Sequence, residues 1–144
     1  RIYQAATLTG KLGIVDLSHR FMLEQRWVGR YTSATLSKED DFVFHNRGRY
    51  MLRGQIPLKG KNITYKTPYA AVYNEIMIGF GKDTGENVFD QNRFGVLLGY
   101  QFNKNLKIEG GYLNQIIQFG REIEGKNVFQ KNNGFIITTA INLN

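Results

Sequence analysis

The chain has 144 residues, 19 Lys and Arg against 12 Asp and Glu, a formal net charge of +7 and no cysteine. This length suits one domain, and the lack of cysteine excludes disulfides and thiolate metal sites. The basic residues are scattered without a dense run, so the positive charge does not predict nucleic acid as a partner.

Alternation of apolar residues with polar or small ones predicts seven strands, because successive side chains of a strand point to opposite faces. In chain order the predicted strands cover residues 1–9, 15–29, 42–56, 69–80, 93–102, 106–118 and 134–143. The fifth is the clearest: every even position is apolar or aromatic, and the odd positions read Arg, Gly, Leu, Gly and Gln. In the sixth, Leu113 and Ile117 fall on the otherwise polar face, which leaves a bulge or a shifted register open.

Short and long connections largely alternate between these strands. The short ones are residues 10–13 and 103–105, the intermediate one is 57–68, and the long polar ones are 30–41, 81–92 and 119–133. Outer-membrane barrels show this alternation, with short periplasmic turns and long outer loops. The pattern therefore predicts that the C-terminal end is periplasmic.

One face of the predicted strands is apolar and aromatic, and the other carries charges of both signs. We predict that the apolar face contacts lipid through Phe21, Leu23, Trp27, Phe44, Tyr50, Leu52, Ile76, Ile78, Phe94, Val96, Leu98, Tyr100, Phe102, Ile108 and Tyr112. We predict that the opposite face forms a charge network in a lumen, from Arg20, Glu24, Arg26, Arg47, Arg49, Arg53, Glu75, Arg93, Lys107 and Glu109.

A soluble barrel would instead bury the apolar face and expose the charged one to water. Three features favour the membrane arrangement. Strands of about ten residues or more match the tilted span of a bilayer. Aromatic residues gather near strand ends, as in interfacial girdles. Charges of both signs recur at similar depth, where they can form cross-strand ion pairs inside a lumen.

Seven segments carry a resemblance to a known family. They are residues 17–27, which end in Glu-Gln-Arg-Trp, then 46–50, 56–58, 73–75, 89–93, 99–100 and 109–115. In this order they resemble the bacterial domain of unknown function 2490, a family of expected outer-membrane barrels of Gram-negative bacteria. The resemblance covers nearly the whole chain and implies a location in the cell outer membrane. It implies no activity, because the family has none assigned.

Seven strands cannot close a bacterial single-chain barrel, which has an even number of strands and no open edge. The family's domain usually has further strands before the position of Arg1. The expected fold is therefore an antiparallel transmembrane β-barrel, with residues 1–144 as the C-terminal portion of the domain. About three to five further strands, from an earlier part of the protein or from another chain, would give about ten to twelve.

The sequence contains few residues in patterns typical of a catalytic or metal-binding site. His45, at the loop end of its strand, and Ser33 and Ser37 in the preceding loop are the candidates for a lipid-modifying site, but the sequence has no nucleophile-elbow pattern. The two histidines are 26 positions apart, which matches no zinc spacing. Residues 39–41 are more typical of a solvated acidic loop than of a cation site. We expect no catalytic residue, no metal and no cofactor.

The Arg-rich face has two interpretations. Glutamates between the arginines form an ion-paired network that fills a narrow lumen, or the arginines line an anion-selective constriction. We expect a non-catalytic structural or accessory barrel, alone or in a larger outer-membrane complex. The alternatives are a narrow anion-preferring pore and a lipid-modifying enzyme. Expected partners are outer-membrane lipid, other envelope proteins, and lipopolysaccharide phosphates at the basic loop residues Lys82, Arg121, Lys126 and Lys131.

Overall fold

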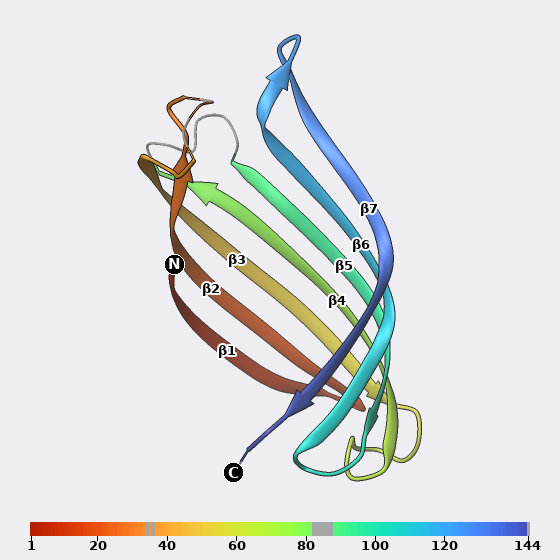
Figure 1. Cartoon of the computed structure of the whole chain (residues 1–144). Helices are drawn as coiled ribbons and strands as arrows, with labels where there is room; N and C mark the ends of the chain where they lie inside the picture. The colour runs from red at the N-terminus through yellow and green to blue at the C-terminus, as the bar shows by residue number, and fades with distance from the viewer. Residues whose placement is uncertain (34, 36, 82–87, 144) are drawn as a thin grey trace.

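The computed structural model describes residues 1–33, 35, 37–81 and 88–143, with Arg30 and residues 120–123 described by their backbone only. These residues form one antiparallel sheet of seven strands and no helix, and the strands follow each other in space as they do in sequence (Figure 1). The strands are β1 (Ile2–Leu12), β2 (Val15–Arg30), β3 (Asp41–Pro57), β4 (Thr67–Phe80), β5 (Phe89–Gln101), β6 (Leu106–Ile123) and β7 (Lys126–Ile141). In the described part of the chain no helix is long and apolar enough to cross a membrane.

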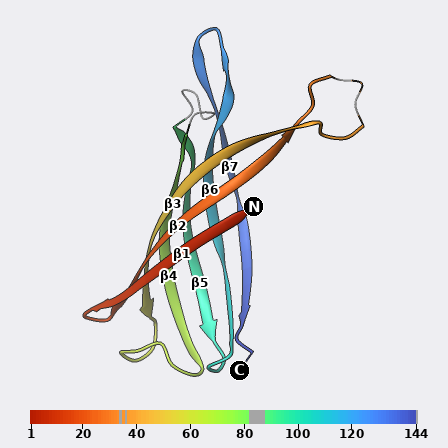
Figure 2. The ribbon, with the colours of Figure 1, turned by 90° about the vertical axis from the view of Figure 1, so that its left-hand side faces the viewer.

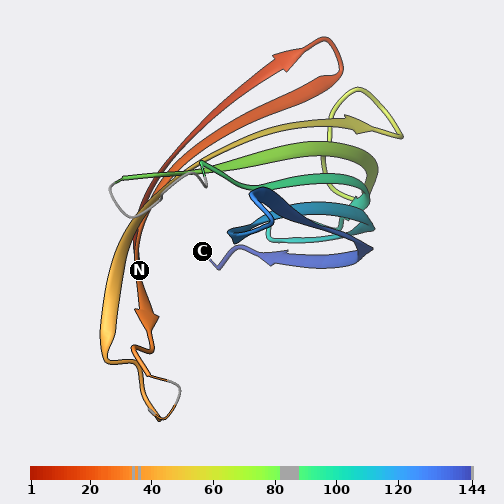
Figure 3. The ribbon, with the colours of Figure 1, turned by 90° about the horizontal axis from the view of Figure 1, so that it is seen from above.

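The sheet is strongly curved and open. Seen from above, it bends into a trough whose two free edges are β1 and β7, which do not pair with each other (Figure 3). The connections at residues 13–14, 58–66 and 102–105 lie at one end, called the lower end after its place in Figure 1, and the other three lie at the upper end. The upper parts of β2 and β3 continue beyond β4 as a projecting hairpin (Figure 2).

The β6–β7 hairpin corrects one expectation. Residues 119–133 were expected to form a long loop and the seventh strand to cover only 134–143, but β6 and β7 continue to a two-residue turn at Glu124 and Gly125. Both turn residues have positive φ, 53° and 69°, as in the type I′ turns that suit hairpins. The loop prediction was wrong because this part of the hairpin is mostly polar and has no sustained apolar alternation.

The pairing of β5 with β6 decides between the bulge and the shifted register considered for Leu113 and Ile117. The register runs without interruption from Gln91 opposite Ile117 to Gln101 opposite Lys107. Neither irregularity occurs there, and Leu113 and Ile117 simply share the concave face with the charged residues. The register shifts of the sheet lie elsewhere, after Met77 in β4 and after Gln118 in β6.

Two glycines of β5 lie beneath tyrosine rings of β4. Gly95 is opposite Tyr73 and Gly99 is opposite Tyr69. A Cβ atom added to Gly95 would lie 2.2 Å from Cε1 of Tyr73, and one on Gly99 would lie 2.3 Å from Cζ of Tyr69. The small residues of this strand are therefore explained by packing. The buried apolar cluster beside these rings consists of Tyr69, Ala71 and Leu97, with Ile63, Tyr73 and Ile136 packed against it.

Gly99→Ala is expected to destabilise the protein by about 1–3 kcal/mol, the usual cost of overpacking, because the new methyl group must displace the Tyr69 ring. Gly134→Ala serves as the control, because a Cβ atom added to Gly134 would have no neighbouring atom within 4 Å, and it is expected to be neutral or slightly stabilising. Equilibrium unfolding in urea measures both. Equal stability of the two variants would contradict the tyrosine-over-glycine packing.

Candidate functional site

The residues predicted to contact lipid share the convex face of the sheet. Thirteen of the fifteen are between 37% and 65% exposed, although all are large apolar or aromatic side chains. Leu23 and Tyr50 are half-buried. Away from the strand ends, the described positions of this face carry uncharged residues, with the exception of Lys131 in β7. An extended apolar surface is therefore left uncovered.

The ten residues predicted to form the charge network share the opposite, concave face. Its carboxylates are the most enclosed: Glu24, Glu75 and Glu109 are only 1%, 3% and 6% exposed. Buried carboxylates are tolerated when they are paired and hydrogen-bonded. Each of these three glutamates has at least one arginine partner, so the concave face satisfies this requirement.

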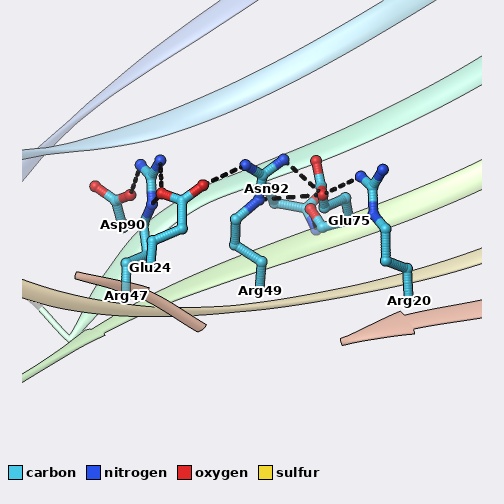
Figure 4. Close-up of polar contacts among 7 residues, drawn as sticks. All are labelled: Arg20, Glu24, Arg47, Arg49, Glu75, Asp90 and Asn92. Carbon is cyan, nitrogen blue, oxygen red and sulfur yellow. Dashed lines mark hydrogen bonds and ion pairs between the residues drawn. The ribbon is translucent and has the colours of Figure 1, made fainter. Parts of the chain in front are cut away.

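Glu24 of β2 joins two arginines of β3. Its Oε2 accepts hydrogen bonds from Arg47 Nη2 at 2.6 Å and Nε at 2.9 Å, and its Oε1 accepts one from Arg49 Nη1 at 2.6 Å. Glu75 of β4 extends this row of ion pairs, since its Oε1 accepts hydrogen bonds from Arg49 Nη2 at 2.8 Å and from Arg20 Nη2 at 2.9 Å. Figure 4 shows these side chains in a row above the sheet. Three strands are thus linked by charge-assisted bonds, the stronger class of hydrogen bond.

Asp90 completes this chain, and it was not among the predicted site residues. Its Oδ2 accepts a hydrogen bond from Arg47 Nη1 at 2.7 Å (Figure 4). Met77 pairs with Gln91 and Ile78 with Phe89, which leaves Asp90 as the extra residue of a β-bulge. Strict alternation assigns Asp90 to the apolar face, whereas the bulge allows its carboxylate to reach the concave face. The ion-pair chain Arg20–Glu75–Arg49–Glu24–Arg47–Asp90 therefore has three cations, three anions and no net charge.

A second cluster lies nearer the lower end. Glu109 of β6 forms a salt bridge with Arg53 of β3 and lies 3.7 Å from Lys107 Nζ. It also accepts a hydrogen bond from the Tyr69 hydroxyl at 2.6 Å. Tyr69 of β4 reaches β6 because its ring crosses Gly99 of β5, which pairs with both Tyr69 and Glu109. Tyr69 was not among the predicted site residues either, because this contact skips a strand.

Two predicted members of the network remain outside these pairs. Among the described residues, neither Arg26 nor Arg93 has a carboxylate within ion-pair distance. Arg93 has a neutral partner instead: with the Gln91 amide turned so that its oxygen faces the guanidinium, that oxygen accepts from Arg93 Nη2 at 3.1 Å. The concave face therefore combines a neutral ion-pair chain with two arginines that lack an acidic partner in the described structure.

The candidates for other chemistry are not brought together. In the described ranges no hydrogen bond links His45 to Ser33 or Ser37; the Ser33 hydroxyl contacts that of Thr35 instead. No group of three His, Cys, Asp or Glu side chains in the described chain has a geometry that holds a metal ion. Lys82 and the Arg121 side chain lie outside the described residues, and Lys126 and Lys131 lie on β7.

Polar side chains that interrupt the convex face bind one another. His19 Nδ1 lies 2.9 Å from the Tyr50 hydroxyl. Asn74 and Asn92 exchange two amide hydrogen bonds of 3.2 Å each. These pairs reduce the number of free donors and acceptors that the convex face presents.

Comparison with known proteins yields a family and no function. The family model described as Protein of unknown function (DUF2490) matches residues 1–124. No curated protein and no solved structure shows significant similarity to the chain. The matched range contains every member of the two ion-pair clusters described above. The chain is a member of the DUF2490 family.

Proposed function

We propose that the chain is part of an antiparallel β-barrel in the bacterial outer membrane, with its convex face in lipid and its concave face lining an ion-paired lumen. The observation that carries this proposal is the reversal of the usual burial: large apolar side chains are exposed while Glu24 and Glu75 are enclosed. Soluble monomers rarely expose a contiguous apolar patch beyond a few hundred Å². A hydrocarbon solvent removes this conflict, because it stabilises the face that water does not.

Aromatic and polar contacts of the convex face support a lipid environment. Ring pairs occur near both ends of the apolar surface, Trp27 with Phe44 at the upper end and Tyr100 with Phe102 at the lower end. Interfacial aromatic girdles have this arrangement. The reciprocal amide pair of Asn74 and Asn92 also suits hydrocarbon, where no water is available to satisfy an unpaired amide.

The direction of the edge strands limits how the barrel closes. β1 and β7 both run from the upper to the lower end, because six antiparallel pairings separate them. Direct pairing of β1 with β7 would be parallel. An all-antiparallel closure therefore needs an odd number of additional strands, and within the expected range of about three to five this means three or five. The additional strands come from another part of the protein or from another chain.

The concave face best supports a barrel with a filled lumen and no catalytic role, which acts as a structural or accessory component of the envelope. The neutral ion-pair chain from Arg20 to Asp90 crosses four neighbouring strands, and side chains arranged in this way would fill the lumen of a small barrel. The alternative is a narrow anion-preferring pore. It is favoured by Arg26 and Arg93, since arginines that have no acidic partner among the described residues attract anions.

Reconstitution of the full-length protein into lipid tests this proposal. The protein is expected to float with vesicles after an alkaline carbonate wash and to show no steady conductance in planar bilayers. Arg47→Ala combined with Arg49→Ala removes both arginines that bind Glu24, and is expected to produce step conductance. Lys38→Ala, in the upper loop, is the control and should stay silent. Release by the carbonate wash would contradict the membrane assignment, and a conducting wild type would favour the pore.

A further inference from the structure

A cavity of about 570 Å³ lies at the lower end of the concave face, away from the neutral ion-pair chain. Three cationic side chains from three strands line it: Lys11 of β1, Arg53 of β3 and Lys107 of β6. Asp16 also lines the cavity, with its Oδ1 3.5 Å from Lys11 Nζ. The cations therefore come from three different strands to one open cavity.

Neutral donors complete the lining. Thr9, Ser18 and Gln55 also line the cavity, and their side chains carry hydroxyl and amide donors. Arg53 is held in place, because its guanidinium binds Glu109 and lies 3.3 Å from Gln55 Oε1. Lys107 has Glu109 as its ion-pair partner, at 3.7 Å, so most of the donor capacity of its ammonium group is unused.

The surrounding lower end is also cationic. Lys59, Lys61 and Lys66 of the β3–β4 connection line a second cavity of about 400 Å³, whose Asn62 accepts a hydrogen bond from Lys11 Nζ. In the described chain, the carboxylates within a few residues of the lower turns are those of Asp16 and Glu109. The upper loop 31–40, by contrast, mixes its lysine with acidic residues. Clustered charge of one sign attracts oppositely charged ligands and raises their local concentration.

We propose that the lower cavity binds a phosphate group. A guanidinium, two ammonium groups and two hydroxyls match the three acceptor oxygens and the negative charge of a phosphate better than they match a singly charged carboxylate. The group has two possible sources, a soluble phosphate compound or the headgroup of a lipid. The site is formed by concave-face residues, so it does not depend on what covers the convex face.

Isothermal titration calorimetry on the full chain in non-ionic detergent tests the site, with sodium pyrophosphate in one arm and monomeric dihexanoyl phosphatidic acid in the other. Saturable binding to one site is expected in at least one arm. Lys107→Gln and Lys11→Gln should each weaken it about tenfold, the loss expected when a charged hydrogen-bond donor is removed. Lys38→Gln, in the exposed upper loop, should leave it unchanged.

Binding of pyrophosphate identifies a soluble source, and binding of phosphatidic acid alone identifies a lipid source; both support the site. No saturable binding in either arm would overturn the proposal, as would affinities that both lysine variants leave within about twofold. Circular dichroism melts verify that the variants are folded. If Lys107→Gln unfolds, Lys11→Gln decides, because its side chain is 43% exposed. Flotation of the protein without phosphate binding would refute this site and leave the barrel proposal intact.

Discussion

Val96→Arg is expected to destabilise the protein by about 2–4 kcal/mol in a lipid bilayer, the cost of an arginine near the midplane on the lipid face of a barrel. Val96 lies on the convex face of β5 and is 44% exposed. It has Val72 and Tyr112 opposite it on the neighbouring strands, and Phe94 and Leu98 next to it on the same face. An arginine at this position has no carboxylate among these neighbours, and on the proposed lipid face it must reach through the acyl chains to find water.

Ile14→Arg is the matched control. Ile14 is also β-branched and 51% exposed, but it lies in the β1–β2 turn at the lower end. Its replacement is expected to change the stability by less than about 0.5 kcal/mol, as for most surface substitutions. Equilibrium urea unfolding of both variants in lipid vesicles measures the difference. Equal and small effects would mean that water, and not hydrocarbon, surrounds the convex face.

The strands on which the lipid-face prediction rests could be predicted from the sequence because their residues alternate between two faces. Between Arg93 and Gln101 of β5, every even position is apolar or aromatic, so each of these side chains could be assigned to one face from the sequence alone. The upper parts of β6 and β7 could not be read in this way. Phe119 and Phe129 lie in these parts, but no sustained alternation of apolar with polar residues marks a strand there.

The members of the charge network could be predicted from the sequence only in part. Alternation placed Glu24 and Arg47 on one face, and their cross-strand pairing brings them together. Asp90 was missed because residues 81–92 were expected to form a loop, whereas β5 begins at Phe89, and because a bulge changes the alternation there by one residue. Tyr69 was missed because its contact with Glu109 crosses an intervening strand at a glycine. A carboxylate at an apolar position near a strand start, and a tyrosine opposite a glycine, are the signals that point to such contacts.

Glu24→Gln is expected to destabilise the protein by about 3–5 kcal/mol, the cost of removing one partner from a buried ion pair. Glu24 is 1% exposed and is the central acid of the ion-pair chain, with hydrogen bonds to both Arg47 and Arg49. An uncharged amide of the same size keeps the packing. It leaves Arg47 with Asp90 and Arg49 with Glu75 as their remaining acids, and the chain gains one positive charge.

The matched control for this change is Glu124→Gln, which removes the same charge at the exposed β6–β7 turn and is expected to alter the stability by less than about 0.5 kcal/mol. Urea unfolding of both variants measures the difference.

A double variant separates the effect of charge pairing from that of packing. Glu24→Gln together with Arg49→Met removes one charge of each sign and is expected to recover part of the lost stability. The reason is that replacing both members of a buried ion pair by neutral side chains costs less stability than removing only one member. A double variant that is less stable than Glu24→Gln by the full cost of Arg49→Met alone would show that the two side chains act independently.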